Sequence, residues 1–344
     1  MPTIRDVAGR AGVAPATVSI VLSGRRPVRE QLRQRVLAAI AATGYRPNQL
    51  ASSLRLARSN TIGILVPDLT NPFFAALVHH LEDLAAEDGY QILLAGSNEN
   101  EAREADRLRT LLSRRIDGLI FTPARDETAA LADHGAHLPP TVLTDRGLLH
   151  ADFDGVGADN HDAVRQGCRH LLELGHRRVS FVVTSVELAN IRERAEGYRA
   201  ALAEAGLAHH ARIIAGGFEI EGCRAAVEQD LRRADRPSAI FAANHVATLG
   251  AVKAIRALDL DFPEAISLLG FDDTEWMTVL RPYLSVIAQP IAAMAETAWR
   301  LLQRRLGDRG APVTRTRLPC TLTVRESTRR PLVAADREPA QLMS

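Results

Sequence analysis

The sequence contains no long apolar segment and few aromatic residues. None of its apolar runs approaches the roughly 18 residues that suggest a membrane-spanning helix. Residues 1–6 lack the apolar stretch of a secretory signal peptide, so we expect a cytoplasmic protein. With 344 residues, 46% of them hydrophobic and 24% charged, the chain has the composition of a globular protein and the length for two or three compact units.

Metal-binding and catalytic motifs are also absent. The three cysteines lie far apart without the spacing of a metal site, and we expect them to be small buried side chains in a reducing compartment. No Gly-x-Gly-x-x-Gly turn follows a predicted strand, and no phosphate-binding loop ends in Gly-Lys-Ser/Thr. The adjacent pairs His79-His80 and His209-His210 would not face one another on a helix. We therefore expect no metal, no cofactor and no enzymatic activity.

Positive charge is concentrated at the N-terminus. The first 58 residues hold ten arginines and only two acidic residues, Asp6 and Glu30. The other 286 residues carry 32 basic and 39 acidic side chains, so a segment of net charge +8 precedes one of −7. The first segment is suited to a polyanion, and the larger second segment is not.

Three short helices are predicted within residues 1–47. Thr3 can cap the first helix with Asp6 as its reciprocal partner, and Gly12 suits the C-terminal stop of that helix. Pro15 fits the first turn of a second helix. Two short helices joined by a glycine-containing turn, followed by a third helix, are typical of a helix-turn-helix module. The alternative is a three-helix bundle with a solvated basic face.

The second and third helices have different expected roles. The third runs from about 29 to 43, with Val36, Leu37 and Ile40 expected to point inward. A helix-turn-helix module presents its second helix to the major groove of DNA. The outward positions of that helix are Pro15, Ala16, Thr17, Ser19 and Ile20.

Residues 48–58 have the pattern of a marginal helix. Asn48 can cap it, and Leu50 and Leu54 fall on one face. A segment of this length is too short to form a stable helix alone in water. We expect it to order only when paired with a second copy or held by DNA, which makes it a candidate switch.

From residue 61 onward, short apolar runs alternate with helical stretches. The runs span residues 61–66, 91–94, 118–121, 141–144, 179–183, 239–243 and 266–270. Continuous apolar strands separated by helices indicate parallel sheets that are covered on both faces. The sequence therefore predicts two doubly wound lobes.

Polar residues follow several of these runs. Ligands of such sheets bind beyond the carboxyl ends of the strands. The residues expected at those ends are Asp68, Asn71, Phe73, Asp145, Arg146, Asp159, Asn160, Arg192, Arg194, Asn244, His245, Asp272 and Asp273. Polar groups that converge from both lobes beside an aromatic platform suit a small polar ligand such as a sugar.

A series of motifs runs along the chain. The N-terminal motif covers much of residues 3–22 and resumes at 44–48; later motifs include Asn71-Pro72-Phe73-Phe74, Asp145-Arg146, Arg194-x-x-Gly197-Tyr198, Asn244-His245 and Gly270-Phe271-Asp272-Asp273. In these motifs, and over essentially its whole length, the chain resembles the lactose-repressor (LacI/GalR) family of bacterial transcription regulators. The resemblance implies an N-terminal all-α helix-turn-helix headpiece plus an α/β periplasmic-binding-protein-like core of two doubly wound parallel-sheet lobes. It also implies a regulator, most simply a repressor, whose affinity for its operator responds to an effector.

The resemblance assigns DNA contacts to the headpiece. In the family, residues matching Pro15, Ala16 and Ile20 read bases, and those matching Thr17 and Ser19 mainly contact phosphates. The full expected set is Thr3, Arg5, Pro15, Ala16, Thr17, Ser19, Ile20, Arg26, Asn48, Leu54 and Arg55. The usual serine before the second helix is Ala14 here, which removes a cap worth about 1 kcal/mol.

The resemblance gives Leu54 a particular role. The matching residue of the family is a wedge that enters a central base step of the minor groove, a known use of an apolar side chain. An ordinary linker or core leucine is the alternative.

The resemblance also assigns an effector cleft. Its expected residues are Asn71, Phe73, Asp145, Asn160, Arg194, His245, Asp272 and Trp276. Core packing remains an alternative for Phe73, a surface ion pair for Arg194 and a loop cap for Asp272. His245 occupies a position where the family usually has aspartate, and we hypothesise that it adapts the cleft to a ligand with an anionic group. A histidine merely tolerated at the rim is the alternative.

The expected organisation follows from the same resemblance. The headpiece is assigned to residues 1–47, the hinge helix to 48–58, the first lobe to 61–160 and 291–319, the second lobe to 161–290 and 320–330, and a frayed tail to 331–344. We expect a homodimer, formed near helices such as 71–88, that binds a near-palindromic double-stranded operator. An exported solute-binding protein is the main alternative, and the basic N-terminal segment argues against it.

Overall fold

The computed structural model of the chain describes residues 2–23, 27–45, 59–125, 129–148, 150, 152–279 and 281–331. The chain forms two compact units, Met1–Ser59 and Asn60–Ser344. The predicted hinge helix 48–58 and tail residues 332–344 lie outside the described residues, as do four predicted DNA contacts, Arg26, Asn48, Leu54 and Arg55. No helix in the described ranges is long and apolar enough to cross a membrane.

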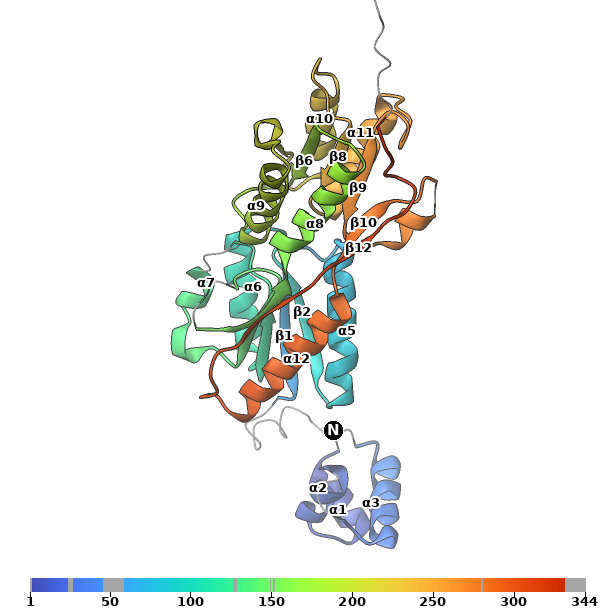
Figure 1. The fold of residues 1–344 in the computed structure, drawn as a ribbon. Coiled ribbons are helices and arrows are strands. Elements are labelled where there is room, and N and C mark those ends of the chain that lie inside the picture. Colours follow the sequence, from blue (N-terminus) through green and yellow to red (C-terminus); the bar gives the residue numbers. More distant parts are fainter. Residues whose placement is uncertain are drawn as a thin grey trace, which may run out of the picture. The chain divides into compact units, whose positions relative to one another are not determined.

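The N-terminal unit is a three-helix module (Figure 1). Its helices are α1 (Ile4–Ala11), α2 (Pro15–Ser23) and α3 (Glu30–Thr43). One valine from each helix, Val7, Val18 and Val36, is fully buried in the common core. The predicted all-α headpiece is confirmed.

Both ends of α1 follow the local chemistry of the sequence. The Asp6 carboxylate accepts hydrogen bonds from the backbone N–H of Thr3 at 2.7 Å and from its hydroxyl at 2.8 Å. Gly12 ends the helix in the left-handed conformation, with φ 62°. The reciprocal half of the predicted capping box is therefore present, and it orients the chain entering α1.

The prediction that Leu37 points inward is wrong. Its side chain is 40% exposed, whereas Val36 and Ala39 are buried and Ile40 packs against them. Residues three or four positions apart share one face of a helix, and the position directly after Val36 is rotated away from that face.

The first lobe of the second unit is a six-stranded parallel sheet. In spatial order it contains β11 (Arg315–Leu318), β5 (Asp154–Ala158), β4 (Thr141–Thr144), β3 (Gly118–Phe121), β1 (Thr61–Val66) and β2 (Gln91–Gly96). One face of the sheet is covered by α5 (Pro72–Glu87) and α12 (Ile291–Gly307), and the other by α6 (Glu101–Ser113) and α7 (Ala129–Ala132). Between α7 and β4 lies the short 3-10 helix η1 (Gly135–His137).

The second lobe repeats this plan with one antiparallel edge. In spatial order its strands are β12 (Thr321–Thr323), β10 (Ser285–Ala288), β9 (Ser267–Phe271), β8 (Ala239–Ala242), β6 (Val179–Val183) and β7 (Arg212–Ala215). Only the β10–β12 pair is antiparallel. The covering helices are α8 (Asn160–Glu173) and α9 (Ala189–Glu204) on one face, and α10 (Ile220–Leu231) and α11 (His245–Ala257) on the other. The 3-10 helices η2 (Ala208–His210) and η3 (Glu275–Thr278) lie in connections.

The chain passes between the two sheets at three connections: from β5 to α8, from β10 to α12, and from β11 to β12. Each connection is only a few residues long. Consequently, polar residues near the crossings lie close to both lobes. The doubly wound parallel architecture predicted from the alternating pattern is confirmed.

Candidate functional site

Helix α2 is anchored on one side and exposed on the other. Val18 is buried in the headpiece core, whereas Pro15 and Ala16 are exposed. Thr17, Ser19 and Ile20 are partly exposed, as a protruding surface helix requires. Ala14 contributes only its backbone carbonyl, which accepts a hydrogen bond from the N–H of Thr17 at 2.9 Å.

The headpiece surface carries mainly arginines. Arg5 and Thr3 are exposed at the start of α1, and Arg10, Arg29 and Arg35 are exposed elsewhere. Asp6 and Glu30 are the two acidic residues among the first 58, so little negative charge offsets these arginines. Such a surface attracts phosphate groups in a salt-dependent manner.

Arg194 is one of the arginines that the second unit buries. Only 2% of its surface is exposed, and its guanidinium lies 3.7 Å from the ring centroid of Phe271. Nε donates to Asn160 Oδ1 at 2.8 Å, and Nη1 donates to the carbonyl of Ala243 at 2.6 Å. Burial lowers the pKa of Arg194, whereas the carboxylates of Asp272 and Asp145 oppose that shift. Arg194 is therefore an element of the core and not a surface ion pair.

Two buried carboxylates come from different lobes. Asp145 follows β4 and accepts a hydrogen bond from Asn190 Nδ2 of the other lobe at 3.0 Å. Asp272 follows β9, and its oxygens accept hydrogen bonds from Gln289 Nε2 at 2.7 Å and from the N–H of His245 at 3.1 Å. Burial raises the pKa of Asp145, and among the smaller influences Arg146 and Arg194 lower it while Asp272 raises it. The three charged groups Asp145, Asp272 and Arg194 therefore act on one another across the two lobes.

His245 is the first residue of α11 and lies against the aromatic ring of Trp276. The two ring centroids are 6.3 Å apart with an interplanar angle of 72°. Burial lowers the pKa of His245, and nearby Asp272 and Asp68 oppose this shift. The imidazole is consequently biased toward its neutral form, which has one donor and one acceptor nitrogen.

Several buried polar atoms around these residues have no hydrogen-bond partner within the described part of the chain. They are Asp145 Oδ1, His245 Nδ1, Thr274 Oγ1, Trp276 Nε1 and Gln289 Oε1. Folded proteins contain few such atoms, because each unmatched buried polar group costs about 1–3 kcal/mol. Their grouping beyond the carboxyl ends of strands of both lobes is the chemical signature of a polar ligand site.

A hollow of about 220 Å³ borders this group. Phe73 and Pro72 from the first lobe line it together with Asp272 and Thr274 from the second. Phe73 also packs edge-to-face against Phe74, with ring centroids 5.0 Å apart. Phe73 thus belongs to the core of the first lobe and also to the edge of the candidate cleft.

Two of the predicted effector residues have local structural partners. Asn71 Oδ1 accepts the N–H of Phe73 at 3.0 Å and caps α5. Asn160 is buried and orients Arg194. Both residues lie beside the cleft, but these bonds occupy part of their hydrogen-bonding capacity.

Sequence reasoning missed three residues of this group. Gln289 follows β10, a strand that was not predicted, and Thr274 precedes η3. Asn190 lies at the start of α9, and only its contact with Asp145 across the lobes reveals a role. Of the three, only Gln289 could have been found from the sequence, because it is a polar residue directly after a strand. That inference would have required β10 to be predicted first.

Comparison with known proteins matches both units. Residues 3–48 match the family described as bacterial regulatory proteins, lacI family, and residues 168–328 match the periplasmic binding protein-like domain. The ribose operon repressor of Escherichia coli K12 is 33% identical over 309 residues, which are 89% of this chain and 93% of that protein. The chain belongs to the LacI family.

Solved structures agree with this assignment. The lac repressor dimer bound to operator and the anti-inducer ONPF is similar with a TM-score of 0.85 at 26% identity, over 95% of this chain and 99% of that one. A LacI-family regulator from Enterococcus faecium with bound ribose matches with a TM-score of 0.71 at 27% identity, over 78% of this chain and 99% of that one. This LacI-family protein is accordingly a DNA-binding transcription regulator, and two of its relatives, the ribose operon repressor and the lac repressor, are repressors by name.

Proposed function

We propose that this regulator is a cytoplasmic repressor that binds a near-palindromic operator as a homodimer and responds to a small, neutral, hydroxyl-rich effector. The main support is the group of unmatched buried polar atoms between the lobes. They include carboxylate and amide oxygens, a hydroxyl, an imidazole nitrogen and an indole N–H. A sugar supplies hydroxyl groups that both donate and accept hydrogen bonds, so it can match such a mixed set.

The charge of the cleft favours a neutral ligand over an acidic one. Two buried carboxylates, Asp145 and Asp272, lie near the buried guanidiniums of Arg194 and Arg146. Arg146 is also bound by the carboxylate of Glu99, so acidic groups outnumber basic ones around the cleft. His245 adds no fixed positive charge, because burial lowers its pKa. An anionic ligand would add like charge to an already acidic site in low-dielectric surroundings. We therefore prefer a neutral sugar to a sugar acid, which reverses our hypothesis for His245.

On the DNA side, we propose that α2 enters the major groove and reads mainly apolar features. Pro15, Ala16 and Ile20 offer no side-chain hydrogen bond, but they can contact thymine methyl groups. Thr3, Arg5, Thr17 and Ser19 would contact the phosphate backbone. Specificity would then depend in part on the shape and deformability of the operator.

The proposed dimer face lies at the edge of the first sheet. β2 is an edge strand, and Leu93 and Leu94 on it are 36% and 45% exposed. With exposed Leu69 they line a groove of about 420 Å³ beside arginines of α6. An exposed apolar edge strand in a monomer invites pairing with another chain, and a second copy is the partner that a two-fold operator requires. The dimeric lac repressor match supports this choice.

Operator binding is the first test. The affinity for an operator selected from genomic fragments should fall about a thousandfold between 50 and 200 mM salt, as expected for six or more phosphate contacts. Fluorescence anisotropy measures this directly. An affinity that does not change with salt would contradict the proposed interface.

Effector class is the second test. Neutral sugars, starting with D-ribose, are compared with sugar acids and sugar phosphates by thermal shift and then by operator release. A true ligand at 100 times its dissociation constant stabilises the protein by about 2.7 kcal/mol. Because effector and operator are linked, each must change the affinity of the other by the same factor. Preferential stabilisation by a sugar acid would overturn the charge argument.

A further inference from the structure

The second lobe carries another hollow, at the end of its sheet opposite the effector cleft. Its volume is about 200 Å³. Arg178 precedes β6 and Arg212 is the first residue of β7, so the hollow lies at the amino ends of these strands. The effector residues follow the carboxyl ends of strands in the same sheet. The two sites are therefore separated by the length of the sheet.

The walls of this hollow are fixed from behind by buried groups. The hydroxyl of Tyr198 donates to the carbonyl of Val179 at 2.6 Å and accepts the N–H of Arg212 at 2.9 Å. The buried carboxylate of Asp230 accepts the hydroxyl of Ser180 at 2.6 Å and the Arg212 guanidinium at 2.9 Å. A site whose walls are held in this way needs little reordering when a ligand binds.

Part of the charge around the hollow is already matched. Arg212 donates to Asp235 at 2.5 Å as well as to Asp230. Asp235 in turn accepts from Arg233 at 2.9 Å. The single acidic side chain that lines the hollow is thus held by two arginines. As far as the structure describes the chain, the remaining basic side chains of the hollow have no carboxylate partner.

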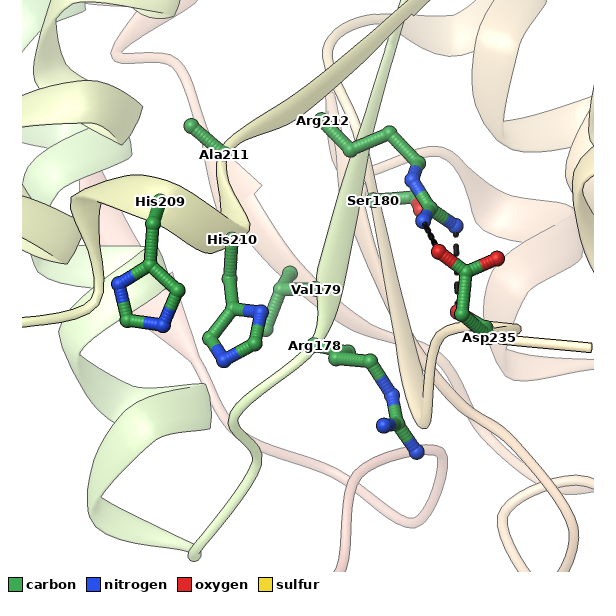
Figure 2. A pocket seen from close by; sticks show the side chains of 8 residues that line it. All are labelled: Arg178, Val179, Ser180, His209, His210, Ala211, Arg212 and Asp235. Carbon is green, nitrogen blue, oxygen red and sulfur yellow. Dashed lines mark hydrogen bonds and ion pairs between the residues drawn. The ribbon is translucent and has the colours of Figure 1, made fainter.

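Those remaining side chains are Arg178, His209 and His210. Among the described residues, none of the three has a side-chain hydrogen bond or an ion pair; Arg178 is anchored only through its carbonyl, which accepts the N–H of Ser238 at 3.0 Å. The two imidazole centroids are 4.1 Å apart on η2. Figure 2 shows both rings and the Arg178 side chain around the hollow, with the Arg212–Asp235 pair beside them.

We propose that this hollow binds a small tetrahedral oxyanion, of the class of inorganic phosphate or a phosphate monoester. Arg178 would donate from its planar guanidinium, and His209 and His210 would donate from ring N–H groups. Charge-assisted bonds of this kind are the strong ones. A metal is the other common partner of neighbouring histidines, but no group of three suitable ligands occurs in the part of the chain that the structure describes. The site is independent of the effector cleft.

The test uses the full-length protein and inorganic phosphate, titrated against chloride at constant ionic strength. Phosphate should raise the thermal unfolding midpoint and shift the ring signals of His209 and His210 in NMR spectra, with one saturable dissociation constant. The variants Arg178→Gln and His210→Gln should each weaken that binding about tenfold or more, as expected for the loss of one charge-assisted hydrogen bond. Both positions lie at the surface of the hollow, so the fold should survive.

Matched controls make the result specific. Arg300→Gln removes an exposed arginine from the other lobe, and His80→Gln alters the other adjacent histidine pair. Both should bind phosphate like the wild type. Equal phosphate affinity in all four variants, or no saturable binding by the wild type, would overturn the proposal. Tighter binding of the dicarboxylate malonate than of phosphate would overturn the assigned class. Operator affinity of Arg178→Gln should equal that of the wild type, which separates this test from the proposed repressor function.

Discussion

At the scale of single residues, Asp272 holds together two elements beside the cleft. Its two oxygens accept hydrogen bonds from His245 at the start of α11 and from Gln289 just after β10. It adopts a left-handed backbone conformation with φ 70°, which asparagine also tolerates. Because both oxygens already face donors, replacing one oxygen by an amide NH₂ creates a donor–donor contact. Asp272 is therefore a sensitive position even for an isosteric change.

Asp272→Asn should weaken effector binding about tenfold to a hundredfold, because it removes charge-assisted hydrogen bonds. Operator affinity without effector should remain within about twofold of the wild type. Thermal shift with the identified effector and anisotropy with the operator measure the two quantities. Asp162→Asn, which alters an exposed ion pair with Arg165, is the control. A variant that responds normally to the effector would show that the cleft is assigned wrongly.

Glu104 is a second residue whose role can be measured, here through the pH dependence of the protein's stability. It is buried in the first lobe, and its carboxylate accepts the N–H of Ala124 at 2.5 Å. Burial raises its pKa to about 7, opposed by the Ala124 hydrogen bond and by Arg146 and reinforced by Glu101 and Glu99. From about pH 4.5 to 7 the folded protein retains a proton that the unfolded chain has lost. Stability should therefore fall as the pH rises through this window.

Glu104→Gln removes this titration while it keeps an acceptor for Ala124. The free energy of unfolding of the variant, relative to the wild type, should increase by about 2 kcal/mol between pH 5 and pH 8. Urea unfolding at both pH values gives this difference. Glu101→Gln, on the exposed side of the same helix, should show no such increase. Parallel pH profiles for Glu104→Gln and wild type would mean that Glu104 is ionised throughout.

Sequence reasoning identified the charged residues of the cleft better than their neutral neighbours. Arg194, Asp145 and Asp272 were selected because charged residues near the ends of buried strands stand out against apolar surroundings. Gln289 and Thr274 are ordinary surface residue types, and nothing in their local sequence distinguishes them. Their importance arises from burial beside Asp272, which depends on how distant segments pack.

At the scale of elements, strands were predictable where both faces of the sheet demand apolar side chains. β1, β3, β4, β6, β8 and β9 are central strands, and their apolar runs predicted them to within a residue or two. β5 was missed because Gly155 and Gly157 leave it without an apolar run. A Cβ atom would lie 2.6 Å from the Leu148 side chain at Gly155 and 2.7 Å from it at Gly157. The two glycines therefore leave the space that the Leu148 side chain occupies.

The edge strands β11 and β12 were missed for a different reason. β11 and β12 are short, lie at the sheet edges, and consist mostly of polar residues. Such a segment becomes a strand only because a neighbouring strand is available to pair with it. Arg315–Leu318 pairs with β5 along its length, and Thr321–Thr323 pairs with β10. Both pairings form only after the chain has crossed from one lobe to the other. They depend on the tertiary fold and not on the local sequence.

The hinge segment 48–58 carries a prediction that rests on the sequence alone. If Leu54 wedges into the operator, Leu54→Ala should weaken operator binding about tenfold and reduce the bend of the bound DNA, because the apolar insertion that holds the kink is lost. Gel mobility of circularly permuted operator fragments reports the bend. Leu56→Ala, off the predicted apolar face, is the matched control, and effector binding should be unchanged in both. An unaltered bend in Leu54→Ala would remove the wedge.

At the scale of the whole molecule, binding to a two-fold operator depends on holding two headpieces together. Each headpiece offers only a short recognition helix and a limited number of phosphate contacts. When two binding modules are linked, the second binds at a high effective concentration, and the combined affinity rises about a hundredfold to ten-thousandfold. The apolar groove beside β2 therefore has a consequence for DNA affinity even though it contacts no DNA in this proposal.

Leu93→Asp tests that consequence, because a two-fold interface places each substitution in the contact twice. The charged side chains should convert the dimer to a monomer in sedimentation experiments and weaken operator binding about a hundredfold or more. Val313→Asp, at a similarly exposed valine before β11, should leave both properties unchanged. A Leu93→Asp protein that remains dimeric would place the interface elsewhere, and a monomer with wild-type operator affinity would show that one headpiece suffices.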